Sequence, residues 1–205
     1  VQDIETSYLL NELKDNDVKN FVNDSMIQIK YVSKTLSDFR NFLKPSTKKV
    51  LFSISKALNE INEIIGKQVF YSNINMNFNY KNKNEELLIY GYENEFKQVL
   101  LNIINNAKNK IVEKNLPLNK KGEININIQR CENCNMIEII DDAGAIDEKI
   151  INSIFEPYFT TKENGMGLGL YMAKIIIEDK MKGTISVRND KNCVIFTIKL
   201  PFKKA

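Results

Sequence analysis

Apolar side chains in the first 44 residues recur at alternating steps of four and three positions. This seam is made of Val18, Val22, Ser25, Ile29, Val32, Leu36, Phe39 and Leu43. An a/d repeat held over more than three heptads predicts a helix over about 17–43 that packs against a partner helix, most simply a second copy. A solitary amphipathic helix lying on its own domain is the alternative.

Polar residues mark both ends of this predicted helix. The run Asp15-Asn16-Asp17 is able to cap its start, and Pro45 stops it. Upstream, Ile4, Tyr8 and Leu13 indicate the tail of a preceding helix. Residues 1–44 are therefore predicted to form a helical hairpin.

After a linker at 45–49 the pattern becomes mixed. Helices are predicted over about 53–65, 93–114 and 168–180, and extended segments over 50–52, 71–80, 87–90, 124–129, 137–139, 184–187 and 194–200. Ile124, Ile126 and Ile128 alternate with polar residues, which is the period of a half-buried strand. Because the strands fall mostly in hairpins, the pattern favours an α+β fold, a two-layer sandwich with helices on one face of a mixed sheet, over residues 50–205.

The amino-acid composition argues against several classes of protein. The net charge of +3 is mild and the lysines are scattered, so a nucleic-acid surface is not expected. Cys131 and Cys134 have a metal-like spacing, but the chain contains no His to complete a tetrahedral site, so we interpret the cysteines as structural or incidental. No apolar stretch is long enough to cross a membrane. The chain begins at Val1 without Met, which we interpret as a piece of a longer protein, and that parent protein could still be bound to a membrane.

Three asparagines share one face of the predicted helix over 93–114. Asn102, Asn106 and Asn109 stand at i, i+4 and i+7. Carboxamide oxygens are ligands for Mg²⁺, which usually shares its coordination with nucleotide phosphates. Since the chain is rich in Asn, the row alone is also explained by composition.

Two glycine-containing elements follow. At Ile139–Ile146 a strand ends in Asp141 and small residues, where an acid is placed to accept a hydrogen bond from a base and the backbone can approach a flat ring. At Gly165–Leu170 a Gly-x-Gly-x-Gly run opens a helix, whose amides favour phosphate. The run lacks the leading strand of a Rossmann motif and the Lys-Ser/Thr of a Walker A loop.

Between these elements lies Ile154-Phe155-Glu156-Pro157-Tyr158-Phe159-Thr160-Thr161-Lys162. The order of the Asn helix, the Asp turn, this Phe segment and the glycine run resembles the N, G1, F and G2 boxes of sensor histidine kinases, which share an ATPase fold (Bergerat or GHKL type) with gyrase, Hsp90 and MutL. The Phe segment is similar to the histidine-kinase F box and is lacking in those other ATPases. The segment over 33–42 resembles the second helix of the kinase dimerisation hairpin.

The resemblance implies a role for each matched position. Asn106 would hold Mg²⁺ with support from Asn102, Asp141 would bind the adenine amino group, and Phe155 and Phe159 would anchor the lid. The implied ATP-binding set is Asn102, Asn106, Asn109, Asp141, Gly144, Ala145, Ile146, Phe159, Thr160, Thr161, Lys162, Gly165, Met166, Gly167, Leu168, Gly169 and Leu170. The implied cofactors are ATP and Mg²⁺, and the implied partners are a second copy and a response-regulator receiver domain. The implied location is cytoplasmic, and a longer parent anchored in the inner membrane stays open.

Three positions depart from the family's G1 box in two ways. Asp142 stands where Asn is usual, and Ala143 and Ala145 stand where glycines are commonest. A methyl group at Ala145 would force a backbone shift if φ were positive there, and Asp142 would add negative charge near a nucleotide. A pseudokinase that serves as a dimeric signalling scaffold is therefore the alternative to a working kinase. A related non-kinase ATPase is disfavoured by the F box, and a purely structural coiled coil explains only the first 44 residues.

The family transfers phosphate to a His on the first stalk helix, and this sequence contains none. A helix over 17–43 would be about 40 Å long, whereas residues 1–13 span about 20 Å, so its antiparallel partner is only half present. We interpret this as truncation just past the phosphate-accepting His. The chain by itself is expected not to autophosphorylate, and the uncovered seam at Leu36, Phe39 and Leu43 is expected to be disordered or to find a partner.

Overall fold

The computed structural model describes Leu9 and residues 14–43, 45–82, 85–114, 116–117, 120–162 and 165–201. The chain divides into two compact units, Val1–Phe42 and Leu43–Ala205. Apart from Leu9, the predicted first arm of the hairpin lies outside the described residues. In the long helix α2 the described side chains are those of 15–27, 29 and 30, so the prediction for Leu36, Phe39 and Leu43 also lies outside them.

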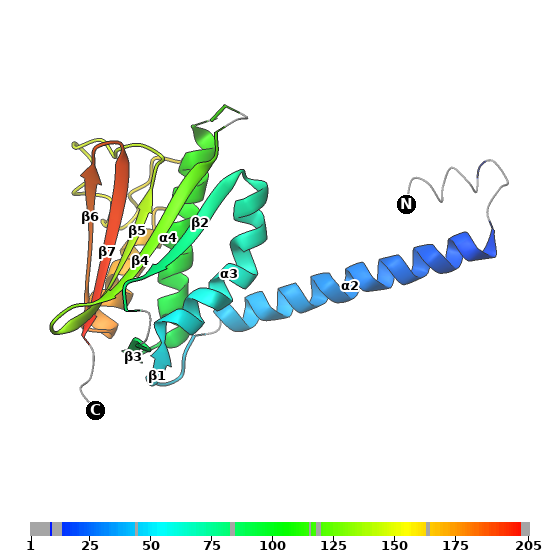
Figure 1. Cartoon of the computed structure of the whole chain (residues 1–205), viewed down its shortest axis with the longest axis horizontal. Coiled ribbons are helices and arrows are strands. Elements are labelled where there is room, and N and C mark those ends of the chain that lie inside the picture. Colours follow the sequence, from blue (N-terminus) through cyan, green and yellow to red (C-terminus); the bar gives the residue numbers. More distant parts are fainter. Residues whose placement is uncertain are drawn as a thin grey trace. The chain divides into compact units, whose positions relative to one another are not determined.

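Helix α2 spans Asp15–Leu43, as the heptad pattern predicted (Figure 1). Its start is fixed by Asp17, whose carboxylate accepts the Lys14 N–H at 3.1 Å, while the Asp17 N–H donates to the Lys14 carbonyl at 2.9 Å. This exchange is half of a capping box. Four side chains on the helix are 41–57% exposed: Val18, Val22, Met26 and Ile29. Three of these side chains belong to the predicted seam.

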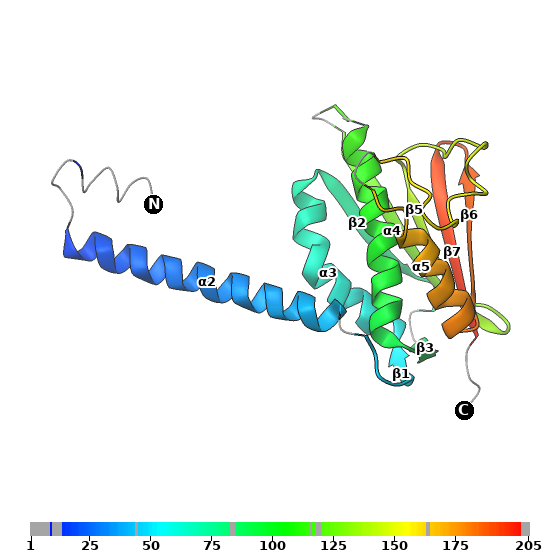
Figure 2. The ribbon, with the colours of Figure 1, turned by 180° about the vertical axis from the view of Figure 1, so that it is seen from behind.

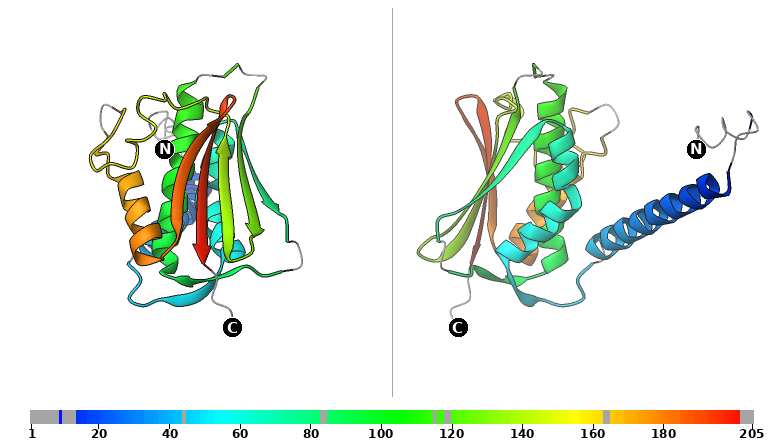
Figure 3. Two further views of the ribbon diagram at one scale, coloured as in Figure 1. Left: turned by 90° about the vertical axis from the view of Figure 1, so that its left-hand side faces the viewer. Right: turned by 45° about the vertical axis from the view of Figure 1, so that its right-hand side comes forward.

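The second unit is a two-layer α+β sandwich, as predicted. Its five-stranded sheet has the order β2-β4-β5-β7-β6, and the strands are Ile74–Tyr80, Gly122–Arg130, Cys134–Asp141, Cys193–Pro201 and Thr184–Asp190 respectively. β2 pairs with β4 in parallel, and the other neighbours are antiparallel. The helices cover one face of this sheet (Figures 2 and 3).

The core lies between the sheet and the helices α3 (Ile54–Tyr71) and α4 (Glu93–Glu113). Alternate residues of β4 and β5 are fully buried against the helices, which explains the predicted period of two; these are Ile124, Ile126, Ile128, Ile137 and Ile139. A small second sheet pairs β1 (Val50–Ser53) with β3 (Leu88–Gly91).

Two helices differ from the sequence prediction, one in its end and one in its type. α3 continues past Gly66 to Tyr71 instead of ending near Ile65, because Val69 is only 1% exposed and its burial outweighs the poor helix propensity of Gly66. The predicted helix over 168–180 begins as α5 (Gly169–Lys174) and continues as a π-helix, η1 (Ile175–Lys180). The Met181 N–H closes the wider turn on the Ile176 carbonyl at 3.0 Å.

The linker is packed onto the start of α4. The N-cap residue of α4, Tyr92, makes no side-chain cap bond. Ser46 replaces it: its hydroxyl accepts the Asn94 N–H at 3.2 Å, and its own N–H donates to the Glu95 carboxylate at 3.3 Å. This reciprocal pair is a capping box assembled from two distant parts of the chain.

Candidate functional site

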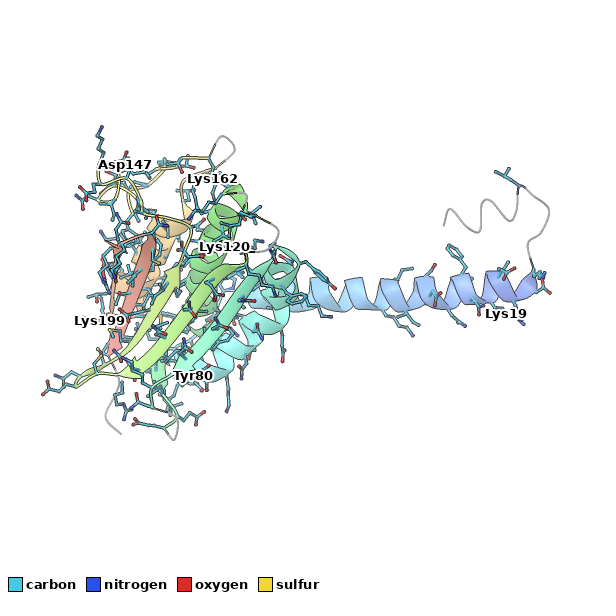
Figure 4. All side chains as sticks on the ribbon, turned by 45° about the horizontal axis from the view of Figure 1, so that its top comes forward. Lys19, Tyr80, Lys120, Asp147, Lys162 and Lys199 are labelled. Carbon is cyan, nitrogen blue, oxygen red and sulfur yellow. The ribbon has the colours of Figure 1, made fainter. Side chains whose placement is uncertain are left out.

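A cavity of about 420 Å³ opens at the end of the sheet where β5 finishes. Its walls are the second half of α4, the end of β5, the long loop after it and the start of α5. Asp147 and Lys162, both in the lining, lie at this end of the sheet, away from Tyr80 (Figure 4). The lining contains fourteen residues predicted from sequence: Asn102, Asn106, Asp141, Gly144, Ala145, Ile146, Phe159, Thr160, Thr161, Lys162, Gly165, Gly167, Gly169 and Leu170.

The α4 wall carries two of the three predicted asparagines. Asn102, Asn106, Ala107 and Lys110 form the cavity-facing arc of the helix. Asn109 does not line the cavity, because it falls just outside this arc and is exposed. The site therefore uses two asparagines of the row.

Asp141 ends β5 as a buried carboxyl group that is 4% exposed. Its oxygen accepts the Ala143 N–H at 3.1 Å. The pKa of Asp141 is raised to about 6, chiefly by burial; the Ala143 amide lowers it, the nearby Asp142 raises it, and Lys114 lowers it. The cavity thus contains an acceptor whose charged form is costly unless a donor pairs with it.

The turn after Asp141 accommodates both departures from the family pattern. Gly144 has a φ of +102°, whereas Ala143 and Ala145 are not among the described residues with positive φ, so the one glycine stands where the backbone requires it. The Asp142 carboxylate accepts the Glu123 N–H of β4 at 2.9 Å and does not line the cavity. The concern that Ala145 strains the turn is therefore removed.

The same loop is fastened to β6 by a residue that the sequence did not indicate. Asn189 accepts the Ile146 N–H at 2.9 Å and donates to the Ile146 carbonyl at 2.8 Å. This two-bond clasp fixes the wall of the cavity beside Asp141. A lone Asn near the end of a strand, 43 positions away, carries no sequence signal for this role.

The glycine run lies against the asparagines of α4. A Cβ on Gly169 would fall 2.5 Å from Oδ1 and 2.9 Å from Nδ2 of Asn102, so only glycine allows this close approach. Two members of the run are not in the lining: Met166 is 79% exposed, and Leu168 stands beside the cavity in the turn that starts α5. The Phe segment is anchored where Phe155 meets Phe196 edge to face, with ring centroids 6.4 Å apart.

Eight further lining residues complete the site: Ala107, Lys110, Ala143, Asp147, Ile150, Ile154, Val194 and Phe196. Most are apolar and give the cavity beside Asp141 a hydrophobic wall. Ala107, Val194 and Phe196 stand at ordinary core positions of a helix and a strand, so sequence alone did not separate them from the core.

The residues present fit a purine nucleotide with a hard cation. The cavity has the size and apolar lining of a small-ligand site. Asn102 Nδ2 is buried and has no hydrogen-bond partner among the described residues, so a donor is left for a ligand. Asn106 offers an amide oxygen of the kind Mg²⁺ takes, and no group of three or more Cys, Asp or Glu side chains able to hold a metal occurs in the described part of the chain.

Comparison with known proteins agrees with this geometry. A family model for histidine kinase-, DNA gyrase B-, and HSP90-like ATPases matches residues 91–204. Sporulation kinase A of Bacillus subtilis (strain 168) is 30% identical over 171 residues, which are 82% of this chain and 27% of that protein. The catalytic domain of histidine kinase ThkA has a TM-score of 0.64 at 28% identity, covering 76% of this chain and 96% of that domain. ThkA in complex with response regulator protein TrrA gives a TM-score of 0.63 at 22% identity, over 97% of this chain and 56% of that one.

The chain belongs to the histidine kinase-, DNA gyrase B- and HSP90-like ATPase family. Within that family it is a sensor histidine kinase catalytic domain, as the four sequence boxes predicted. The chain spans 27% of the length of sporulation kinase A. None of the helices in the described part of the chain has the length and apolar character of a membrane span.

Proposed function

We propose that the chain binds Mg-ATP in this cavity and supplies the γ-phosphoryl group to a histidine outside these 205 residues, for relay to a response regulator. The observation that carries the proposal is the single cavity that unites Asn102, Asn106, Asp141 and the glycine run. These groups come from segments far apart in the chain, and each suits a different part of a nucleotide.

The division of labour follows from the position of each group. The buried Asp141 carboxylate would accept a hydrogen bond from the adenine amino group, beside the apolar Ile150, Ile154 and Phe196. Backbone amides of the glycine run and the ammonium of Lys162 suit the phosphates. Asn106 would hold Mg²⁺, which when bound neutralises phosphate charge. Catalysis then depends on positioning and electrostatics, without a covalent group in this domain.

The proposal extends to two partners. The ThkA structure contains a response regulator protein, and a receiver domain of that kind is the partner we propose for this chain. The exposed apolar side chains of α2, among them Val18, Val22 and Ile29, support a homodimer formed through that helix.

Calorimetric titration of Mg-ATP tests the proposal, with Asn106→Ala and Asp141→Ala alongside. Each substitution removes one proposed contact and is expected to weaken binding about tenfold or more, which corresponds to about 1.4 kcal/mol. Asn127→Ala is the matched control, because it removes an amide whose oxygen accepts from Asn79 on the sheet and which does not line the cavity. If the folded wild-type chain binds no nucleotide, the proposal fails and the pseudokinase scaffold becomes the better reading.

A further inference from the structure

A tight turn in the loop between β5 and α5 fixes the backbone of Lys162. The Thr160 hydroxyl accepts the Lys162 N–H at 3.0 Å, and the Lys162 carbonyl accepts the Gly165 N–H at 3.1 Å. A Cβ on Gly165 would lie 2.3 Å from Thr160 Oγ1 and 3.2 Å from Lys162 Cβ. The turn therefore requires glycine at position 165, and it fixes the backbone position from which the Lys162 side chain extends.

From this turn, Lys162 reaches α4. Its Nζ donates to Oδ1 of Asn106 at 3.1 Å, across 56 positions of sequence. In the described residues no carboxylate pairs with this half-buried ammonium, so the Asn106 amide oxygen is its side-chain partner. A hydrogen bond to a charged donor in such a setting is about twice as strong as a neutral one.

The acceptor atom of this bond is the one that the proposed function gives to Mg²⁺. Magnesium requires near-octahedral oxygen ligands at about 2.0–2.1 Å, so it needs the lone pairs of Asn106 Oδ1 at close range. An ammonium on the same oxygen would place a second positive charge about 4 Å from the divalent metal, and like charges this close in a partly buried site repel strongly. The two cations therefore exclude one another.

We propose that the Lys162 ammonium occupies the Asn106 amide oxygen while no metal is bound. A divalent metal that enters with the nucleotide must then displace this ammonium from the oxygen. This inference rests on the proposed function. While Lys162 stays on Asn106, the loop between β5 and α5 is bonded to α4. Displacement by the metal releases this loop from α4. The metal requirement of the site is thus set partly by Lys162, a positioning residue that acts through Asn106.

The test is the ratio of ADP dissociation constants measured in EDTA and in Mg²⁺, by calorimetry on the whole chain. In Lys162→Met the metal no longer has to displace an ammonium, so the ratio is expected to rise at least about threefold above wild type. A direct contact between Lys162 and phosphate alone would lower affinity in both buffers and leave the ratio unchanged.

Lys110→Met is the matched control. Lys110 also lines the cavity and loses the same charge, but its ammonium is paired with Glu113 at 2.7 Å and does not bond to Asn106. Its ratio is expected to match wild type, although its affinities fall. A ratio in Lys162→Met equal to or below that of wild type overturns the inference and leaves the proposed function standing. Absence of ADP and ATP binding by the folded wild-type chain overturns both.

Discussion

At the scale of single residues, the buried Asp141 carboxylate lowers the free energy of unfolding at neutral pH. Its pKa is raised to about 6, mainly by burial, from an ordinary value of 3.8. Because the folded state holds the proton more tightly, the carboxyl group stabilises the fold at low pH, and this contribution is lost as the pH rises through about 6. The full difference is up to about 3 kcal/mol.

Asp141→Asn is therefore expected to be more stable than wild type at pH 8, by a margin that shrinks by about 1 kcal/mol or more at pH 5. The amide stays neutral at both values, and its oxygen is still able to accept the Ala143 N–H. Urea unfolding of both proteins between pH 5 and pH 8 measures the difference, in which all other titrating groups cancel. A difference that does not change with pH would show that the pKa of Asp141 is not raised.

At the scale of elements, α4 depends on a cap from outside its own segment. The Ser46 hydroxyl accepts the Asn94 N–H, the Ser46 N–H donates to the Glu95 carboxylate, and Tyr92 makes no side-chain cap bond. Ser46→Ala is expected to lower the free energy of unfolding of the second unit by about 1 kcal/mol, the usual cost of a lost cap. The neighbouring Thr47→Ala is the control, since Thr47 is exposed and should be neutral. Equal stabilities in chemical denaturation of the two variants would contradict the cap.

The helices and strands show which parts of the fold sequence patterns predict and which parts they do not. Local periodicity predicted β4, β5 and α4, because alternation and helical spacing are written in adjacent residues. The predicted end of α3 was wrong, because Gly66 disfavours a helix locally, whereas the burial of Val69 that extends the helix depends on tertiary packing. The π-helical half of the last helix was also missed, because its apolar spacing is compatible with an α-helix.

In the cavity, the motif residues were predictable because each carries its own chemistry, as Asn106 and Asp141 do. The clasp from Asn189 and the cap from Ser46 were not, because each joins segments more than 40 positions apart through an unremarkable polar residue. The Lys162–Asn106 bond has the same character: both residues stood in the predicted set, but nothing in the sequence paired them. Long-range side-chain pairing is the information that the structure adds.

At the scale of the whole molecule, α2 presents an apolar surface that needs a partner. Val18, Val22 and Ile29 are exposed within the described chain, and burying such side chains in a coiled-coil seam contributes about 1.5–3 kcal/mol each. The chain is therefore expected to be a dimer at micromolar concentration. Val22→Glu places a charge in the seam and is expected to shift the equilibrium to monomer, as read from sedimentation velocity.

Asn20→Glu is the matched control for the dimer, because it adds the same charge on the opposite side of the helix. It should sediment as wild type does. If both glutamate variants stay dimeric, the contact does not use this part of α2; if both become monomeric, net charge and not the seam is responsible. Monomeric Val22→Glu should still bind Mg-ATP with the affinity of the wild-type chain, because every proposed nucleotide contact comes from the second unit. Weaker binding by the monomer would mean instead that the cavity needs a second copy to be complete.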